Sequence, residues 1–202
     1  MRNQYYIVRH GYSWRNKNNI ASCWPEKKRC PLTKQGKKQA GAVAKKLKKK
    51  DIDLIFASDL LRTRQTAEII GKEIGLKVIF DKRLREADVG IFNGQSIDKI
   101  GRLWDKERKL HPLEYYQKRF KTAPPKGETY ADIEKRMFDF VKKTEKKYRG
   151  KNILIVSHQR PLTLLEKAVY NYSLKKFVKI IIENREIKTG ELRELSNKKH
   201  GA

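Results

Sequence analysis

The chain has 202 residues, 38% of them hydrophobic, and carries a formal net charge of +26 from 49 Lys and Arg against 23 Asp and Glu. This length and composition predict one compact domain over residues 1–202, and no apolar stretch approaches the ~18 residues of a membrane span. Residues 1–4 lead into a predicted strand without a signal-like apolar region, so we expect a cytoplasmic protein with no membrane partner.

The first part of the sequence alternates predicted strands and helices. An apolar run over residues 5–8 predicts a buried strand, and apolar residues at helical spacing over 40–47 predict an amphipathic helix. The same patterns predict a strand over 54–57, a helix over 66–74 and a short strand over 77–80. The order is that of βαβ units.

The middle of the sequence is a long polar excursion over residues 84–126, with one helix expected at 97–110. Excursions of this kind often cover active sites. It is followed by the remaining predicted elements: a helix over about 130–149, a strand over 153–156, a helix over 161–170, a strand over 177–182 and a polar, loosely held tail over about 184–202.

The alternating elements predict an α/β fold of three layers, α/β/α, with a mostly parallel central sheet. Ligands of such folds bind beyond the carboxyl ends of the strands. Polar residues follow the predicted strand ends, and we expect them to converge: Arg9, His10, Arg62, Glu86 and His158.

This set of side chains contains the groups that phosphoryl transfer requires, namely a nucleophile, cations around the phosphate oxygens and an acid. A histidine with an ordinary pKa of ~6.5 is mostly neutral near pH 7, so His10 is the candidate nucleophile. Arg9 and Arg62 can hold the phosphate, and His158 can donate to its oxygens. Glu86 is the candidate acid for the leaving alkoxide, with burial favouring its protonated form and the arginines opposing it.

Five motifs in chain order resemble those of the histidine phosphatase superfamily, the phosphoglycerate mutase-like proteins, in its branch of small phosphatases. Residues 9–16 are similar to R-H-G-x-(S/T)-x-x-N, and residues 58–67 to S-x-L-x-R-x-x-Q-T-A. Residues 84–94 are similar to L-x-E-x-x-x-G-x-x-x-G, 127–129 to G-E-(S/T) and 156–158 to V-S-H. The resemblance spans residues 5 to about 170, and five ordered motifs are far more specific than a single one.

The resemblance implies a phosphoglycerate mutase-like fold and chemistry that needs no metal and no cofactor. It implies that His10 is phosphorylated during the reaction. The roles that it implies for the other residues agree with the chemistry above: a phosphate pocket of Arg9, Arg62 and His158, and an acid at Glu86.

Three further residues are candidates for substrate contact. The resemblance implies that Ser13 and Asn16 lie near the phosphate, although a helix cap or a loop hydrogen bond explains each equally well. The chain departs from the family pattern in having Tyr12 after Arg-His-Gly and Gln159-Arg160 after the second histidine. Arg160 can reach a second anionic group of the substrate, or it can simply be exposed to solvent.

We expect a phosphomonoester hydrolase that acts on a small phosphorylated metabolite through a phosphohistidine. A phosphoglycerate mutase-type phosphotransferase is the alternative, because the same pocket serves both reactions. The net charge raises another alternative, a polyanion- or nucleic-acid-binding protein that has kept the fold without catalysis. The lysines are spread over helix faces without stacking aromatics, which argues against nucleic acid as a partner. A second copy of the chain, in a homodimer, remains a further candidate partner.

Overall fold

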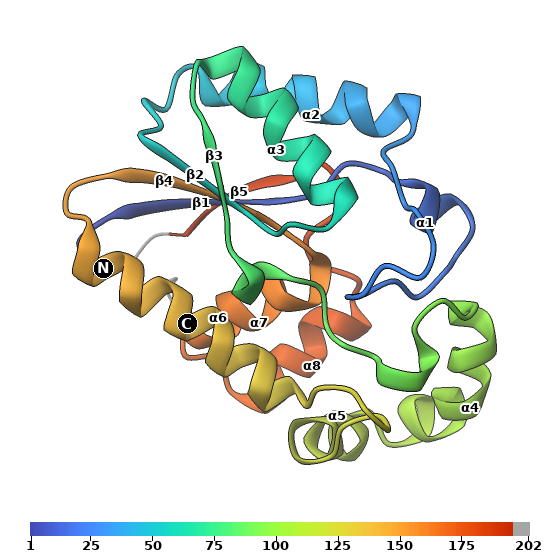
Figure 1. Ribbon diagram of the computed structural model, residues 1–202. Helices are drawn as coiled ribbons and strands as arrows, with labels where there is room; N and C mark the ends of the chain where they lie inside the picture. The colour runs from blue at the N-terminus through green and yellow to red at the C-terminus, as the bar shows by residue number, and fades with distance from the viewer. Residues whose placement is uncertain (196–202) are drawn as a thin grey trace.

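A five-stranded sheet forms the middle layer of the protein (Figure 1). The computed structural model describes residues 1–195, except for the side chains of residues 99 and 102–106. The strand order is β3-β2-β4-β1-β5, in which β5 is antiparallel to β1 and all other neighbours are parallel. The strands are β1 (Gln4–Arg9), β2 (Leu54–Ala57), β3 (Val78–Phe80), β4 (Asn152–Ser157) and β5 (Leu192–Leu195).

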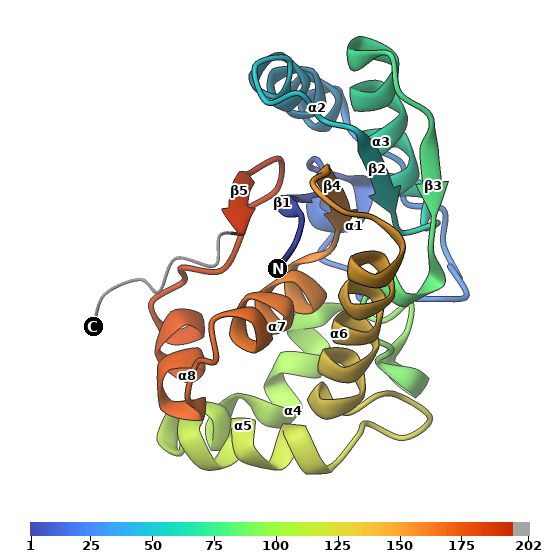
Figure 2. The same cartoon turned by 90° about the vertical axis from the view of Figure 1, so that its left-hand side faces the viewer.

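Helices cover both faces of the sheet (Figure 2). The helices α2 (Lys34–Leu47) and α3 (Leu61–Ile74) cover one face, and α6 (Tyr130–Lys147) and α7 (Gln159–Val169) cover the other. The mostly parallel α/β/α architecture is therefore confirmed. The remaining elements are α1 (Trp14–Lys17), the short turns η1 (Lys82–Leu84) and η2 (Gly90–Phe92), α4 (Ile97–Leu110), α5 (Pro112–Lys121) and α8 (Leu174–Ile182).

Alternation along β1 explains how a continuous apolar run serves two cores. Successive side chains of a strand point to opposite faces of the sheet. Tyr5 and Ile7 pack into the core beneath α6 and α7, whereas Tyr6 and Val8 pack into the core beneath α2 and α3. Strands buried on both faces are apolar at nearly every position, which is the pattern that made these segments recognisable in the sequence.

The predicted strand over residues 177–182 is wrong, because these residues belong to helix α8. The hydroxyl of Ser173 caps the helix by accepting a hydrogen bond from the amide of Lys176. Phe177 and Val178 are buried, and Ile181 packs against the same core from the next turn. A short run of apolar, β-branched residues fits a strand and a buried helical face equally well, and here packing decides.

The expectation of a loosely held tail is wrong for residues 184–195. This stretch contains β5, which pairs with β1 so that Leu195 lies opposite Tyr5. Ile187 and Leu195 are buried. Residues 196–202 lie outside the described part of the chain, so the expectation is untested there.

The excursion over residues 84–126 contains the expected helix α4. It also contains helix α5, which the sequence pattern did not indicate.

Close backbone contact fixes the loop that follows β1. A Cβ atom on Gly11 would lie 2.4 Å from the carbonyl oxygen of Gly36, and one on Gly36 would lie 2.1 Å from the carbonyl oxygen of Tyr12. Only glycine allows the two segments to approach so closely. The start of α2 thereby holds the loop at the carboxyl end of β1. None of the described helices has the length and apolar character that crossing a membrane requires.

Candidate active site

Neighbouring strands bring the two predicted histidines together. Arg9 at the end of β1 is in register with Ser157 at the end of β4, so His10 and His158 leave adjacent strands at the same edge. Their ring centroids are 5.3 Å apart, and both side chains are fully buried. The carboxyl edge of the parallel sheet is therefore where the site forms, as expected for open α/β folds.

His10 is held in one tautomer by its two partners. Its Nδ1 lies 2.8 Å from the carbonyl oxygen of Gly11, which can only accept a hydrogen bond, so Nδ1 carries the proton. Its Nε2 accepts the Nε–H of Arg62 at 3.2 Å. Burial lowers the pKa of His10 well below 6.5, and the charges of Arg62 and Arg9 lower it further. The ring is therefore neutral, with its lone pair on Nε2.

Arg62 is completely buried at the start of α3 and is fixed by several acceptors. Its Nη1 pairs with Oε1 of Glu26 at 3.0 Å, and its Nη2 donates to the carbonyl oxygen of Ser22 at 2.9 Å. Burial lowers the pKa of Arg62 to about 10, so the guanidinium remains charged at neutral pH. A fixed cation beside Nε2 of His10 is suited to binding an oxyanion there.

Arg9 and His158 present further donors to the same space. The Nη1 of Arg9 donates to the carbonyl oxygen of Ile187 at 3.2 Å, and burial lowers the pKa of Arg9 to about 10. The Nε2 of His158 lies 2.9 Å from the hydroxyl of Ser58, and its Nδ1 lies 3.9 Å from Oε2 of Glu86. Burial lowers the pKa of His158 well below 6.5, with the charge of Arg62 adding to the effect.

Several buried side-chain nitrogen atoms around the site make no hydrogen bond of good geometry with the described residues. They are Arg9 Nε, Arg15 Nε, His158 Nδ1 and Arg160 Nη1, the last of which still forms an ion pair with Oε1 of Glu186 at 2.9 Å. Buried donors without acceptors are rare and costly in native proteins, most of all when the group is charged. The geometry is that of a site that an anion completes. Over the part of the chain that is described, no three His, Cys, Asp or Glu side chains are grouped so that they can hold a metal ion.

Two of these residues, Arg15 and Arg160, line a cavity of about 210 Å³. Glu86 lines it, together with Arg15 from α1, Arg119 from α5 and Arg160 at the start of α7. The polar excursion supplies part of this lining, in accord with its predicted position over an active site. The cavity wall thus brings a carboxyl group together with several cations, and Glu86 on that wall lies 3.9 Å from Nδ1 of His158.

The structure brings together most of the predicted site. Arg62 contacts His10, Glu86 approaches His158, and Arg160 lines the cavity with Glu86. Arg9 lies among them, at the end of β1.

Ser13 and Asn16 contact each other instead of lining the cavity. The Oδ1 of Asn16 accepts from both the amide and the hydroxyl of Ser13, at 3.0 and 2.8 Å. The side chains thus form the cap of α1 that the sequence offered as the alternative explanation. Their predicted contact with phosphate remains a prediction.

Sequence reasoning missed four residues of the site: Arg15, Glu26, Ser58 and Glu186. Arg15 occupies a position that the first motif leaves open to any residue. Its positive charge beside the motif residues was the only sign that it belongs to the site. Ser58 lies just before α3, whose N-cap residue is Leu60, and its hydroxyl lies 2.9 Å from Nε2 of His158. Glu186 is buried and pairs with Arg160 at 2.9 Å, from a stretch that the sequence assigned to the tail.

Residues 185–195, which we call the strap, contact the end of β1 and so support the site. The amide of Gly190 donates to the carbonyl oxygens of Arg9 and His10, at 3.1 and 3.2 Å. The carbonyl oxygen of Ile187 accepts from the Arg9 guanidinium. Both the backbone and the side chain of the strand end are therefore held by the strap.

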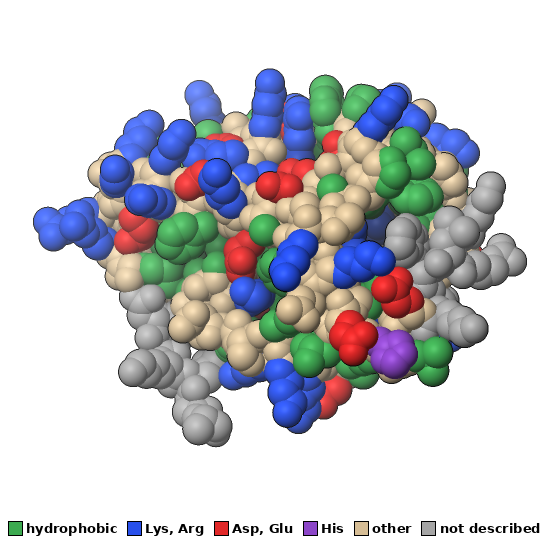
Figure 3. Space-filling view, turned by 90° about the horizontal axis from the view of Figure 1, so that it is seen from below, with side chains coloured by type: hydrophobic (Ala, Val, Ile, Leu, Met, Phe, Trp, Pro, Cys, Tyr) green, Lys and Arg blue, Asp and Glu red, His purple; other side chains and the backbone are tan. Residues whose placement is uncertain are grey.

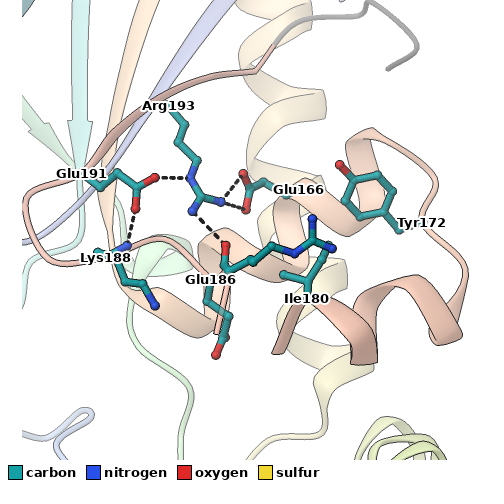
Figure 4. Close-up of a pocket in the computed structure, with 8 residues that line it drawn as sticks. Glu166, Tyr172, Ile180, Glu186, Lys188, Glu191 and Arg193 are labelled. Atoms are coloured by element: carbon teal, nitrogen blue, oxygen red, sulfur yellow. Dashed lines mark hydrogen bonds and ion pairs between the residues drawn. The ribbon is translucent and has the colours of Figure 1, made fainter. Parts of the chain in front are cut away.

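Arg193 ties the strap to α7 (Figure 4). Its guanidinium lies between two carboxylates, 2.7 Å from Glu191 and 3.1 Å from Glu166, and donates to the carbonyl oxygen of Arg185 at 2.9 Å. These groups line a second cavity, of about 550 Å³. Burial raises the pKa of Glu166, and Arg193 opposes this rise. The network makes the strap a braced support, not a loose end.

Comparisons with known proteins agree with this fold. The family model of the histidine phosphatase superfamily (branch 1) matches residues 5–198. A probable phosphoglycerate mutase GpmB of Photorhabdus laumondii is 36% identical over 160 residues, covering 77% of this chain and 69% of the relative. A probable phosphoglycerate mutase GpmB of Escherichia coli is 33% identical over 156 residues, with the same coverage.

Solved structures share the fold. A mycobacterial glucosyl-3-phosphoglycerate phosphatase superposes with a TM-score of 0.79 at 22% identity, covering 96% of this chain and 89% of that one. YhfR of Bacillus stearothermophilus gives a TM-score of 0.74 at 26% identity, with 87% and 83% covered. A putative α-ribazole-5'-P phosphatase of Escherichia coli gives 0.74 at 22% identity, with 97% and 92% covered.

Proposed function

The chain belongs to the histidine phosphatase superfamily, and we propose that it hydrolyses the phosphomonoester of a small metabolite through a phosphohistidine at His10. The observation that carries the proposal is the state of the His10 ring. Its Nε2 lone pair is available, it is flanked by the charged Arg62, and the proton sits on Nδ1 facing Gly11. A neutral nitrogen in a cationic pocket is what attack on a phosphate dianion needs.

In the first step the phosphate group of the ester lies in the cationic pocket. Nε2 of His10 attacks phosphorus, the nitrogen–phosphorus bond forms, and the bond from phosphorus to the ester oxygen breaks. Glu86 in its protonated form donates its proton to the departing alkoxide, which leaves as an alcohol. Arg9, Arg62 and His158 donate to the three remaining oxygens and so stabilise the negative charge on them.

In the second step water replaces the alcohol. The Glu86 carboxylate takes a proton from the water, whose oxygen attacks phosphorus, and the bond to Nε2 of His10 breaks. Inorganic phosphate leaves, and His10 and Glu86 return to their starting protonation states. The position of Glu86 on the cavity wall, 3.9 Å from Nδ1 of His158, supports its use in both steps.

Trapping the intermediate tests the proposal. The protein is mixed with a ³²P-labelled ester, quenched in alkali and digested, because phosphohistidine survives alkali and is lost in acid. We expect the label on the peptide that contains His10, and none in the His10→Ala variant. Arg64→Gln is the matched control, since Arg64 lies on the same helix as Arg62 but pairs with Glu68 at the surface. Label in the His10→Ala variant, or none in an active wild-type protein, would refute the mechanism.

The second candidate function is phosphoglycerate mutase activity, which the names of the two GpmB relatives favour. The same phosphohistidine would then pass its phosphate to another hydroxyl instead of to water. Incubation with 3-phosphoglycerate, with and without 2,3-bisphosphoglycerate, separates the two. Release of inorganic phosphate supports the hydrolase, whereas net formation of 2-phosphoglycerate without phosphate release supports the mutase.

The basic surface leaves the polyanion-binding alternative open to test. Lys and Arg side chains are scattered over the face in Figure 3, with Asp and Glu between them. Turnover of a small ester is expected to fall only modestly as salt rises. Binding of DNA through six to ten phosphate contacts would weaken by ~10³ or more between 50 and 200 mM salt. A protein that shows the steep loss and no turnover would be a binder and not a hydrolase.

A further inference from the structure

We infer that Glu26 is a positioning residue, whose carboxylate fixes Arg62 so that the Nε–H of this arginine faces His10. Asn93 holds the loop that carries Glu26, residues 22–26, which we call the arginine loop. The inference rests on the proposed function, because His10 is the nucleophile only in that proposal. It adds two residues that act on the reaction through Arg62 and not through the substrate.

Glu26 is the only acidic residue in a strongly basic segment. Residues 1–50 contain 15 Lys and Arg and this single carboxylate. Residues 27–29, which follow it directly, are all cationic and exposed. The side chain of Glu26 is only 16% exposed and reaches inward to Arg62, whose side chain is completely buried. The carboxylate therefore serves a fixed cation in the interior, although mobile cations lie beside it in the sequence.

Both carboxylate oxygens of Glu26 have a partner at the start of α3. Oε1 accepts from Nη1 of Arg62 at 3.0 Å, and Oε2 accepts from the amide of Leu61 at 3.0 Å. These are the first two residues of the helix, and the N-cap residue Leu60 makes no side-chain hydrogen bond that caps it. A carboxylate is favourable here because helix N-termini have free amides and a partial positive charge. Glu26 therefore fixes the arginine twice, through its helix and through its guanidinium.

Ser22 completes the hold on the guanidinium. Its hydroxyl accepts from Nη1 of Arg62 at 3.3 Å, and its carbonyl oxygen accepts from Nη2 at 2.9 Å. Both Nη nitrogens are thus anchored in the arginine loop, while Nε donates to Nε2 of His10 at 3.2 Å. The guanidinium is planar and its N–H groups form a rigid fork, so anchoring the Nη nitrogens sets the direction of Nε–H. The loop therefore aims the donor that faces the reacting nitrogen.

The charge of Glu26 distinguishes positioning from attraction of the substrate. Burial lowers the pKa of Arg62 to about 10, and the negative charge of Glu26 is among those that oppose the fall. The same charge repels an incoming phosphate, because like charges at close range disfavour each other. An arginine that served only to attract an anion would bind it more tightly without this partner. Removal of the Glu26 charge should therefore leave phosphate affinity nearly intact while the orientation of Arg62 is lost.

Asn93 holds the arginine loop from the polar excursion. Its Oδ1 accepts from the amide of Cys23 at 3.2 Å, and its Nδ2 donates to the carbonyl oxygen of Pro25 at 2.8 Å. The Asn93 side chain is buried, so these hydrogen bonds are shielded from water. An amide side chain that bonds the backbone at two points fixes the path of the loop between Ser22 and Glu26. The excursion is thereby linked to the orientation of Arg62.

Glu26→Gln tests the inference by kinetics, because glutamine is of the same size but has one oxygen for two donors. We expect kcat for p-nitrophenyl phosphate to fall about 30-fold, since a small misplacement of a catalytic group is costly in rate. The inhibition constant of inorganic phosphate should stay within about threefold, because Arg62 keeps its charge. Glu26→Asp keeps both oxygens and should retain more activity than Glu26→Gln.

The matched control is Glu68→Gln, which removes a surface carboxylate from the same helix and should leave kcat unchanged. An unchanged kcat in Glu26→Gln would overturn the inference. A loss of phosphate affinity as large as the loss of kcat would overturn it too, because Glu26 would then serve binding and not orientation.

Hydrogen exchange at Nε of Arg62 reports its orientation without turnover. The Nε–H signal in ¹⁵N NMR is assigned by its absence from Arg62→Lys. Exchange should be about tenfold faster in Glu26→Gln than in the wild-type protein and unchanged in Glu68→Gln. Ser173→Ala removes the cap of α8 and controls for a loss of stability at another helix. Normal exchange in Glu26→Gln, or equal acceleration in Ser173→Ala, would overturn the inference.

Asn93→Ala tests the link through the arginine loop. We expect kcat to fall about fivefold, with faster exchange at Nε of Arg62. In the double variant with Glu26→Gln the two losses should not multiply, because both act through the same loop. A double variant that is slower than Glu26→Gln by the full factor measured for Asn93→Ala would show independent effects and would exclude Asn93 from this role.

The outcome is separable from that of the proposed function. If the wild-type protein hydrolyses esters but Glu26→Gln keeps its kcat and its slow exchange at Arg62, the hydrolase stands and the inference falls. If no ester is hydrolysed but exchange at Arg62 accelerates in Glu26→Gln and not in the controls, Glu26 positions Arg62 and the hydrolase falls.

Discussion

Arg62 donates its Nε–H to Nε2 of His10 across 3.2 Å, although 52 positions separate the two residues in the sequence. A guanidinium has no lone pair to offer, so this contact requires Nε2 to be unprotonated. Burial lowers the pKa of His10 and this cation lowers it further, so the imidazole is neutral, and the cation marks the place where a phosphate oxygen would lie. When an anion enters, Arg62 can turn its donor from the histidine to the oxyanion, which frees the lone pair for attack.

Removal of the His10 ring is expected to abolish hydrolysis while leaving the fold. His10→Ala should lower kcat for p-nitrophenyl phosphate by at least ~10³, because His10 is the described histidine whose ring nitrogen accepts a hydrogen bond from Arg62. The free energy of unfolding should change by no more than about 3 kcal/mol, the range for one buried side chain. Steady-state kinetics and urea unfolding measure the two. Near-normal turnover would contradict the nucleophile assignment.

Glu86→Gln is expected to slow esters according to their leaving groups. Alkyl phosphates should lose ~10²–10⁴ in kcat/KM, the contribution typical of general acid catalysis. p-Nitrophenyl phosphate should lose far less, because its phenolate leaves without a proton. Comparing the two substrates in the wild-type and variant proteins checks this. Losses of equal size would show that Glu86 binds substrate or holds the fold but does not donate the proton.

The sequence predicted the site residues better than it predicted the residues that hold them in place. Apolar runs end where β1 and β4 end, and parallel pairing places those ends side by side, so His10 and His158 could be expected to meet. Their hydrogen-bond partners could not be foreseen. Whether Ser58 caps a helix or meets His158 depends on the angle at which α3 leaves the sheet, which local sequence does not encode.

The strap escaped prediction for a different reason. β5 has the sequence Leu-Arg-Glu-Leu, with charged residues in its middle, because it is an edge strand with one partner. Its pairing with β1 joins the two ends of the chain, and such long-range contacts leave no mark on local periodicity. Arg193 is charged and would be taken for a surface residue, yet it holds Glu166 on α7. The strap is held by contacts between residues far apart in the sequence, and neither residue of such a contact indicates it alone.

Acid pH is expected to destabilise the protein through His10 and His158. Both have pKa values held below 6.5 in the folded state, chiefly by burial, so below that pH the unfolded chain binds more protons than the folded one. Stability is therefore lost as pH falls from about 6.5, by up to ~1.4 kcal/mol per pH unit for each histidine while it stays neutral. Urea unfolding between pH 5 and 7 measures the slope.

The control for this pH dependence is His158→Asn, whose side chain does not titrate. The free energy of unfolding of this variant should fall less steeply with acid than that of the wild-type protein. The two slopes should differ by about the contribution of one histidine. NMR of ¹⁵N-labelled histidine gives an independent reading, with the His10 and His158 rings remaining neutral at pH 6.5, where a free imidazole is half protonated. Parallel stability curves, or protonation of either ring near pH 6.5, would contradict the assignment.

Loosening the strap is expected to weaken catalysis from a distance. Arg193→Met removes the ion pairs with Glu166 and Glu191. We expect the free energy of unfolding to fall by about 2 kcal/mol, because both ion pairs are only partly shielded from water. Because the strap holds Arg9 through Ile187, we also expect kcat/KM to fall about tenfold and inorganic phosphate to inhibit more weakly.

Two variants separate this positioning effect from a general loss of stability. Arg185→Gln removes a guanidinium from the same cavity, but that side chain pairs with Glu183 at the surface, so its kinetics should be unchanged. Adding Glu166→Gln to Arg193→Met removes the unpaired carboxylate and should recover stability without recovering phosphate affinity, because the bridge to the strap is still absent. Hydrogen exchange at the Gly190 amide, which bonds the carbonyl oxygens of Arg9 and His10, should rise in both Arg193 variants. Unchanged exchange there, together with normal phosphate inhibition, would show that Arg9 keeps its position without the bridge.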